Sequence, residues 1–210
     1  MKTLAILGAG GHGRVVADCA EAAGWDEILF FDDKRPTALP ESWRYAGTGT
    51  DLLGQLPRLA GVVVAIGTNS VRLDWHRRLA ALSAPLVSLV HPGAWVSPRA
   101  GVGVGSVVFA GAVINVGARL GEAVIINTGA TVDHDCVLAD GVHVSPGAHL
   151  AGGVTVGEGS WIGIGAVVRE LVDIGERAKV GAGAAVVAHV GSDVTVVGIP
   201  ARPVRRGTDA

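Results

Sequence analysis

Three histidines in the C-terminal half of the 210-residue chain could move protons near neutral pH. His134 is followed directly by Asp135, and His143 and His149 come shortly afterwards. A neutral imidazole with a pKa of about 6.5 is a good general base, and a carboxylate on its other ring nitrogen fixes the tautomer and stabilises the imidazolium. The pair His134–Asp135 therefore predicts a base that removes a proton from an attacking nucleophile.

A second candidate site lies near the start of the chain. The apolar stretch Thr3–Leu7 runs into Gly8, Gly10 and Gly13, which fit the spacing GxGxxG, and Asp32 follows about 20 residues later. A glycine-rich turn before a helix offers backbone N–H groups to a phosphate, and an acidic residue after the next strand can bind a ribose or base edge. The alternative is a tight strand-to-helix turn that binds no ligand.

The elements that position the histidines follow from a repeat of six residues. Every sixth residue from Val96 to Val186 is Ile, Leu or Val, sixteen times in succession, and small or β-branched residues follow four positions later, from Ala100 to Val190. This period fits neither a helix nor a single strand. Each hexad therefore predicts a short strand and a turn, and three hexads close a triangular coil. About five coils stack through parallel strands into a β-helix.

Coils of three hexads predict which residues are stacked. His134 lies between Val116 on the coil before and Gly152 on the coil after. Because Gly152 has no Cβ, an acyl group can approach its N–H closely, which suits an oxyanion donor beside a base. The same spacing gives two further columns, Ile125–His143–Trp161 and Thr131–His149–Val167.

Several outward-facing positions of the predicted β-helix are apolar, which a monomeric solenoid should not show. They are Val107, Val113, Ile125, Val137, Trp161 and Val167. We expect these faces to pack in a homotrimer, with active sites at the subunit interfaces. The alternative is a monomer with scattered exposed valines.

The first 90 residues alternate between predicted strands and helices, which indicates a small parallel α/β domain. The strands are expected at Thr3–Leu7, Glu27–Phe31, Val62–Ile66 and Leu86–Val90, and the helices at Arg14–Ala23 and from the residues after Asn69 through Ala81. His91-Pro92 marks the join. We thus predict a half-Rossmann α/β domain over residues 1–90 and a β-helix with a C-terminal tail over residues 91–210; the loop 34–50 carries no readable pattern.

Composition and charge limit the kinds of partner and location that we expect for the protein. The net charge of −2 and the pI of about 6.4 give no reason to expect nucleic acid. No apolar run reaches the roughly 18–20 residues of a membrane span, and the N-terminal stretch runs into GAGGHG instead of a cleavage site. We expect a cytoplasmic protein without membrane insertion. The chain has only two cysteines, Cys19 and Cys136, which argues against a disulfide framework, and Cys136 occupies an inward small-residue position of the repeat.

The glycine-rich turn and the hexad run together resemble the PglD/NeuD-type sugar acetyltransferases. The segments that carry the resemblance are GAGGHG at 8–13, FFDD at 30–33, AIGTN at 65–69, INTGATVDHDC at 126–136, GVHVSPGAHLAGGVTVG at 141–157 and GIPAR at 198–202. The resemblance covers nearly the whole chain. It implies a left-handed β-helix, acetyl-CoA as co-substrate, a nucleotide-linked amino sugar as acceptor, direct N-acetylation and no metal requirement.

The resemblance also implies a role for each matching residue. His134 is the catalytic base and Asp135 its orienting carboxylate, where some members have glutamate. Asn127 contacts the acceptor sugar. His143, Gly152 and Ile164 contact the acyl-CoA, and Gly152 presents its N–H to the thioester. The sugar nucleotide is expected on Gly11, His12, Gly13, Asp32 and Asn69.

Three other functions compete with N-acetylation. The acceptor could be a hydroxyl of a sialic acid or another sugar. A γ-type carbonic anhydrase shares the β-helix and binds zinc through histidines at subunit interfaces, for which His134, His143 and His149 are the candidates. A non-catalytic solenoid is the third.

Overall fold

The computed structural model describes residues 2–204 of the chain and opens with an α/β domain. Its elements are β1 (Thr3–Leu7), α1 (Gly11–Ala22), β2 (Glu27–Phe31), β3 (Trp43–Gly47), α2 (Gly49–Gln55), the 3-10 helix η1 (Leu56–Arg58), β4 (Gly61–Val64) and α3 (Asn69–Ala81). The strands form a parallel sheet of order β3-β2-β1-β4. Alternate residues of these strands enter two apolar cores, one under α1 and one under α2.

The sheet differs from the sequence expectation at two places. The segment Leu86–Val90 was expected as a fourth strand of this sheet, and that prediction is wrong. Only Leu86 bridges Val62, whereas β5 (Leu89–Val90) pairs with the first coil of the solenoid. The remaining edge of the sheet is instead formed by β3, which comes from the loop 34–50 that the sequence left unassigned.

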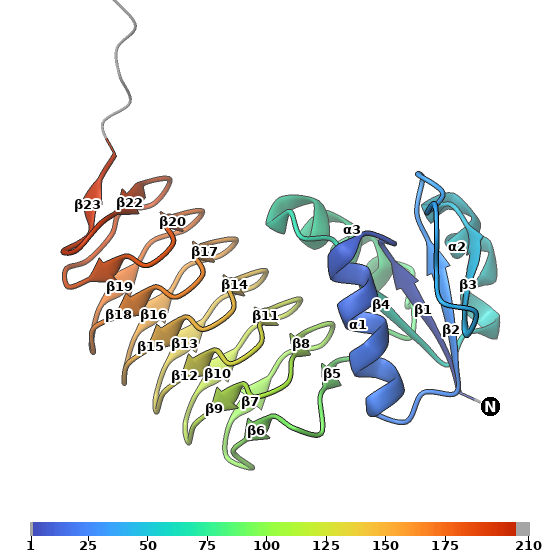
Figure 1. Ribbon diagram of the computed structural model, residues 1–210, viewed down its shortest axis with the longest axis horizontal. Coiled ribbons are helices and arrows are strands. Elements are labelled where there is room, and N and C mark those ends of the chain that lie inside the picture. The colour runs from blue at the N-terminus through green and yellow to red at the C-terminus, as the bar shows by residue number, and fades with distance from the viewer. Residues whose placement is uncertain (1, 205–210) are drawn as a thin grey trace, which may run out of the picture.

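The second part is a parallel β-helix in which a two-residue strand recurs every six residues, as the repeat predicts (Figure 1). Its strands after β5 are β6 (Trp95–Val96), β7 (Gly101–Val102), β8 (Val107–Val108), β9 (Val113–Ile114), β10 (Arg119–Leu120), β11 (Ile125–Ile126), β12 (Thr131–Val132), β13 (Val137–Leu138), β14 (His143–Val144), β15 (His149–Leu150), β16 (Thr155–Val156), β17 (Trp161–Ile162), β18 (Val167–Val168), β19 (Asp173–Ile174), β20 (Lys179–Val180), β21 (Ala185–Val186), β22 (Thr195–Val197) and β23 (Arg202–Pro203). The expected C-terminal tail beyond residue 204 lies outside the described residues.

These strands form the three faces of a prism. We call face 1 the sheet that runs from β5 through β8, β11, β14, β17 and β20 to β22 and β23, face 2 the sheet from β6 to β21, and face 3 the sheet from β7 to β19. Between them run corner 1–2, corner 2–3 and corner 3–1, named by the order in which the chain passes the faces. The register pairs residues 18 apart, so the predicted columns Ile125–His143–Trp161 and Thr131–His149–Val167 are confirmed.

The interior of the β-helix is filled by the two residue series of the repeat. The large aliphatic side chains and the small residues from Ala112 to Val190 are buried in one continuous core. Cys136 is fully buried there, as expected. Its side chain therefore fills a core position and is not presented to solvent.

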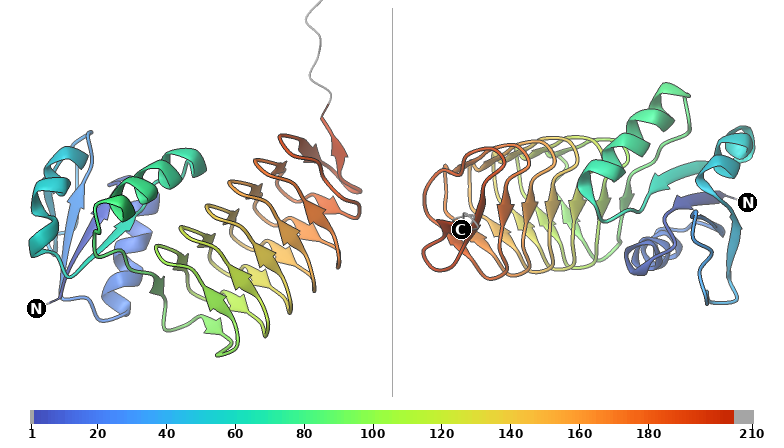
Figure 2. Two further views of the ribbon diagram at one scale, coloured as in Figure 1. Left: turned by 180° about the vertical axis from the view of Figure 1, so that it is seen from behind. Right: turned by 90° about the horizontal axis from the view of Figure 1, so that it is seen from above.

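The α/β domain sits at one end of the β-helix, with α1 against face 1 and α3 lying along the coils (Figures 1 and 2). Val107 and Ile125 share an apolar core with α1 and are about as buried as any core residue. The expectation that these two outward residues pack in a subunit interface is therefore wrong, because the chain's own α/β domain covers them. Val137, Trp161 and Val167 remain exposed. No helix within residues 2–204 is long and apolar enough to span a membrane.

Candidate active site

His134 and Gly152 meet at corner 2–3 on successive coils. The Gly153 N–H donates to the carbonyl of His134, and an ideal Cβ built on Gly152 would overlap Nε2 and Cε1 of the imidazole. His134 Nδ1 lies 2.9 Å from the carboxylate of Asp135, which leaves Nε2 directed over Gly152. Within residues 2–204 the Gly152 N–H has no acceptor. A free base nitrogen and a free N–H donor therefore lie side by side.

The corner raises the basicity of His134. The hydrogen bond with Asp135 is the main cause that raises the pKa of this histidine above its ordinary value, and the charges of Asp133 and Asp135 add to it. Asp133 accepts from Asn115 Nδ2 and from the His134 N–H, and these two bonds lower the pKa of the Asp133 carboxyl. The imidazole is thus surrounded by carboxylate charge that favours its protonated form after proton transfer.

Asp135 occupies a strained backbone position. Its φ is +58°, in the left-handed region where asparagine and aspartate are tolerated better than most residues. The turn carries the carboxylate back beside the preceding ring, where it reaches Nδ1.

His143 lies on face 1 in a different setting. Its Nε2 is 3.2 Å from Asn127 Nδ2, and its ring stacks on Trp161 with centroids 5.6 Å apart. His12, from the α/β domain, approaches to 6.5 Å between ring centroids. Burial and the charge of Arg72 lower the pKa of His143 to about 3 and that of His12 to about 4. Both rings are therefore neutral near pH 7.

Two nitrogens of this histidine pair are buried and have no hydrogen-bond partner among the described residues. They are Nε2 of His12 and Nδ1 of His143. Buried polar atoms are normally paired. These two therefore point to a group that the protein binds between the α/β domain and face 1.

A cleft of about 760 Å³ opens between the start of α3 and face 1. Of the residues predicted to bind ligands it contains Asn69 and His143. The sequence did not predict the roles of Arg77, Lys179 and Trp161, which line the same cleft. The Trp161 ring and the Lys179 ammonium group suit an aromatic and anionic ligand such as a nucleotide, and Asp74 and Glu158 add acidic groups to the lining.

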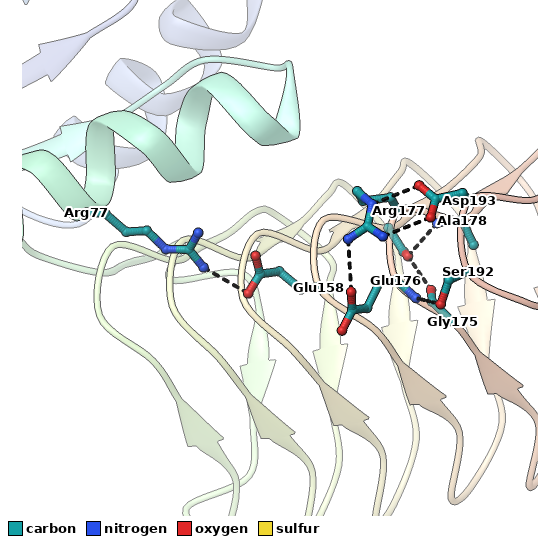
Figure 3. Close-up of polar contacts among 9 residues, drawn as sticks. Arg77, Glu158, Gly175, Glu176, Arg177, Ala178, Ser192 and Asp193 are labelled. Carbon is teal, nitrogen blue, oxygen red and sulfur yellow. Dashed lines mark hydrogen bonds and ion pairs between the residues drawn. The ribbon is translucent and has the colours of Figure 1, made fainter.

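Ion pairs lie along corner 3–1 (Figure 3), and Arg77, Glu158 and Arg177 among them line the cleft. Arg77 of α3 donates to Glu158 at 2.8 Å. Further along, Arg177 donates to Asp193 through two nitrogens and to Glu176. These side chains are exposed, so each pair adds little to folding stability.

Arg72 joins the two domains from a buried position on α3. It is 1% exposed and donates to the carbonyls of Ala123 and Gly141 on the β-helix and of Ile66 in the α/β domain. It also donates to Asn69 Oδ1, while Asn69 Nδ2 donates to the Gly159 carbonyl at 2.9 Å. Asn69, predicted to bind the sugar nucleotide, thus holds the wall of the cleft. No spacing rule in the sequence identifies Arg72.

The glycine-rich turn has two kinds of glycine. A Cβ on Gly8 would overlap the Ala65 carbonyl, and a Cβ on Gly13 would overlap the Gly8 carbonyl, so these two allow close packing. A Cβ on Gly11 would meet nothing within 4 Å, which leaves room for a ligand. Asp32 accepts the Ala9 N–H at 2.8 Å and so also braces the turn.

The predicted residues fall into two groups within one chain. His134, Asp135 and Gly152 lie at corner 2–3. Asn127 and Ile164 lie at corner 1–2, near His143 on face 1. One face of the prism separates the groups, so a single chain does not bring the base and the other predicted substrate contacts together. His149 lies on that face, where its Nδ1 is 2.9 Å from Thr131 Oγ1.

Comparisons with known proteins point to one family. Residues 3–79 match the model of the PglD N-terminal domain. The chain is 40% identical over 114 residues to UDP-N-acetylbacillosamine N-acetyltransferase of Bacillus subtilis (strain 168), a match that covers 52% of each protein. The matched region thus spans about half the length of this curated relative.

Solved structures match over nearly the whole chain. The acetyltransferase domain of PglB from Neisseria gonorrhoeae FA1090, in complex with acetyl coenzyme A, is 46% identical, with a TM-score of 0.93 and coverage of 97% of this chain and 99% of that one. PerB from Caulobacter crescentus, in complex with CoA and GDP-perosamine, is 38% identical, with a TM-score of 0.90 and 98% coverage of both chains. These likenesses confirm the expected fold, an N-terminal half-Rossmann domain followed by a left-handed parallel β-helix.

Proposed function

The chain belongs to the PglD-type family of sugar acetyltransferases, and we propose that it transfers the acetyl group of acetyl-CoA to the amino group of a nucleotide-linked amino sugar. The named relatives support both substrates, since they include N-acetyltransferases of UDP- and GDP-linked sugars and complexes with CoA. The observation that carries the proposal is the pairing of His134 with Asp135 beside the free N–H of Gly152.

The chemistry follows from this corner. The sugar amine attacks the thioester carbonyl while His134 Nε2 accepts a proton from the amine, and Asp135 stabilises the resulting imidazolium. The Gly152 N–H donates to the oxyanion of the tetrahedral intermediate. Collapse breaks the carbon–sulfur bond, and the imidazolium returns the proton to the leaving thiolate of CoA. We expect direct transfer, because Cys19 and Cys136 are both buried and neither is placed to act as a nucleophile.

We assign the two substrates to the two parts of the chain. Residues 1–90 hold the nucleotide through Gly11, His12, Gly13, Asp32 and Asn69. Residues 91–210 hold the acyl-CoA, with His143, Gly152 and Ile164 as contacts, and Asn127 serves the acceptor sugar. Gly11 offers open space for this role, and Ile164 is 58% exposed at corner 1–2. The proposal needs no metal and includes a cytoplasmic location.

A homotrimer completes the site in this proposal. His134 lies on one side of face 2, and the group around Asn127 and His143 lies on the other side. A complete site therefore needs His134 from one chain and the Asn127–His143 group from a second chain. Exposed apolar side chains beside His134 support a docked neighbour, since Val116 is 50% exposed and Leu171 is 72% exposed. We therefore place each active site between corner 2–3 of one chain and corner 1–2 of the next.

Acetyl-CoA consumption against a panel of nucleotide-linked amino sugars and free sugars tests this function. We expect turnover with an amino-sugar nucleotide, and replacement of His134 by alanine should lower kcat by roughly 10²–10⁴-fold. Turnover only with sugars that offer a hydroxyl would assign O-acetylation instead. An unchanged rate in H134A would refute the mechanism.

A further inference from the structure

The side-chain amide of Asn127 has a defined orientation. Its Oδ1 accepts the backbone N–H of Thr128 at 2.9 Å. A backbone N–H can only donate, so the amide oxygen must be the atom on that side. The NH₂ group is consequently the atom that faces His143.

This orientation fixes the tautomer of His143. The Asn127 NH₂ group has no lone pair to offer, so at 3.2 Å it donates to His143 Nε2, which must be unprotonated. In a neutral imidazole the proton then resides on Nδ1. His143 is neutral at physiological pH because burial and the charge of Arg72 disfavour its protonated form.

The Nδ1–H of His143 is buried and has no acceptor among residues 2–204. An unsatisfied buried donor is costly, so a bound group that accepts a hydrogen bond would fill this position with a gain in affinity. His143 lines the interdomain cleft, and the stacked Trp161 ring holds the imidazole plane in place. The position suits an oxygen atom of a substrate.

We propose that Asn127 is a positioning residue that acts through His143: it holds this histidine as a hydrogen-bond donor toward a substrate oxygen in the interdomain cleft. The inference rests on the proposed function, and it gives Asn127 a task besides, or instead of, direct contact with the acceptor sugar. The oxygen belongs to the sugar nucleotide or to the acyl-CoA, and the kinetics described below separate these two sources.

The tautomer can be measured without turnover. In protein labelled with ¹⁵N-histidine, NMR of the side-chain nitrogens should show Nδ1 of His143 protonated and Nε2 unprotonated, with H143F identifying the signals. N127D replaces the donor by an acceptor, so Nε2 should become protonated. N115A is the matched control, because Asn115 is a turn asparagine that contacts Asp133 and no imidazole ring, and it should leave His143 unchanged. A protonated Nε2 in the wild type, or an unprotonated Nε2 in N127D, would overturn the proposal.

A double-mutant cycle tests whether Asn127 acts through His143. N127A and H143F should each lower kcat/KM by about 10- to 100-fold, as expected for a lost buried hydrogen bond, and the double variant should lose no more than about 2-fold beyond the worse single one. H143F keeps a flat ring against Trp161. Losses that multiply would mean independent roles and contradict the inference. The substrate whose KM rises in the single variants identifies the source of the oxygen. Because the NMR measurement needs no turnover, it distinguishes failure of this inference from failure of the proposed function.

Discussion

At the residue scale, Asp135 raises the pKa of His134 and should therefore set the pH range in which this proposed base acts. The base must be unprotonated, so kcat/KM should fall as the pH drops through the raised pKa of His134. D135N removes the main cause of the raised pKa, so the acidic limb should move to lower pH while the plateau rate falls. D173N is the matched control, because Asp173 pairs with His189 on another coil at 3.3 Å. If the acidic limb shifts equally in both variants, or in neither, Asp135 does not control the pKa of the base.

Gly152 makes a second prediction at this scale. G152A should push the imidazole of His134 out of place, and a displacement of about 1 Å can cost about 100-fold in rate. The melting temperature should stay close to that of the wild type, because the obstructed atoms belong to an exposed, movable side chain. G101A is the control, since a Cβ on Gly101 meets nothing within 4 Å. Full activity in G152A would show that the ring need not lie over this glycine.

The residues of this corner could be predicted from sequence because the repeat fixes their spacing. His134 and Gly152 are 18 residues apart, so three hexads bring them together whatever the rest of the chain does. The Asn127–His143 contact joins residues 16 apart, and the repeat does not state how those side chains turn. The role of the buried Arg72 could not be predicted from any repeat. Its acceptors are backbone carbonyls, which every residue has, so no sequence pattern marks them.

At the element scale, the docking of α1 and face 1 buries His12 and His143 in neutral form. Their pKa values of about 4 and about 3 lie below the ordinary 6.5. The contribution of these two neutral rings to the free energy of unfolding is therefore fully present above about pH 6.5. It is lost as the pH falls toward those values, by about 2–3 kcal/mol per histidine at pH 4.5. Urea unfolding at fixed protein concentration measures the free energy of unfolding. Between pH 7.5 and 4.5 this free energy should fall by less for H143F than for the wild type. Equal losses would mean that His143 is not buried as a neutral ring.

The sequence predicted the elements unevenly for a physical reason. In the β-helix a strand recurs every six residues, so the position of each strand follows from the repeat. β3 is a half-exposed edge strand without alternation, and its place is fixed by backbone pairing with β2. The apolar segment Leu86–Val90 would fit either the sheet of the α/β domain or face 1 of the β-helix. Its last two residues pair with β8 of the β-helix.

At the scale of the whole molecule, Arg72 fixes how the α/β domain sits on the β-helix. R72M would leave the buried carbonyls of Ala123 and Gly141 without their donor, so we expect a loss of stability of about 3 kcal/mol and a lower melting temperature. R77Q removes only an exposed ion pair with Glu158 and should cost less than about 1 kcal/mol. Differential scanning calorimetry of the two variants makes the comparison. Similar melting temperatures would show that Arg72 does not hold the two domains together.

Outward apolar residues are only a partial guide to the proposed subunit interface. Such residues indicate burial but not what buries them, and two of the six are covered by the chain's own domain. The separation of His134 from the Asn127–His143 group is the stronger argument for a neighbour, because it concerns the site itself.

Mixing two impaired variants tests most directly whether each active site is shared between two subunits. H134A and H143A chains are unfolded together, refolded at equal amounts and assayed for acetyl transfer. If each site takes His134 from one chain and His143 from the next, random assembly of a cyclic oligomer leaves about a quarter of the sites intact. We predict recovery of about a quarter of the wild-type activity. A mixture no more active than the sum of the two separate variants would contradict a site shared between subunits.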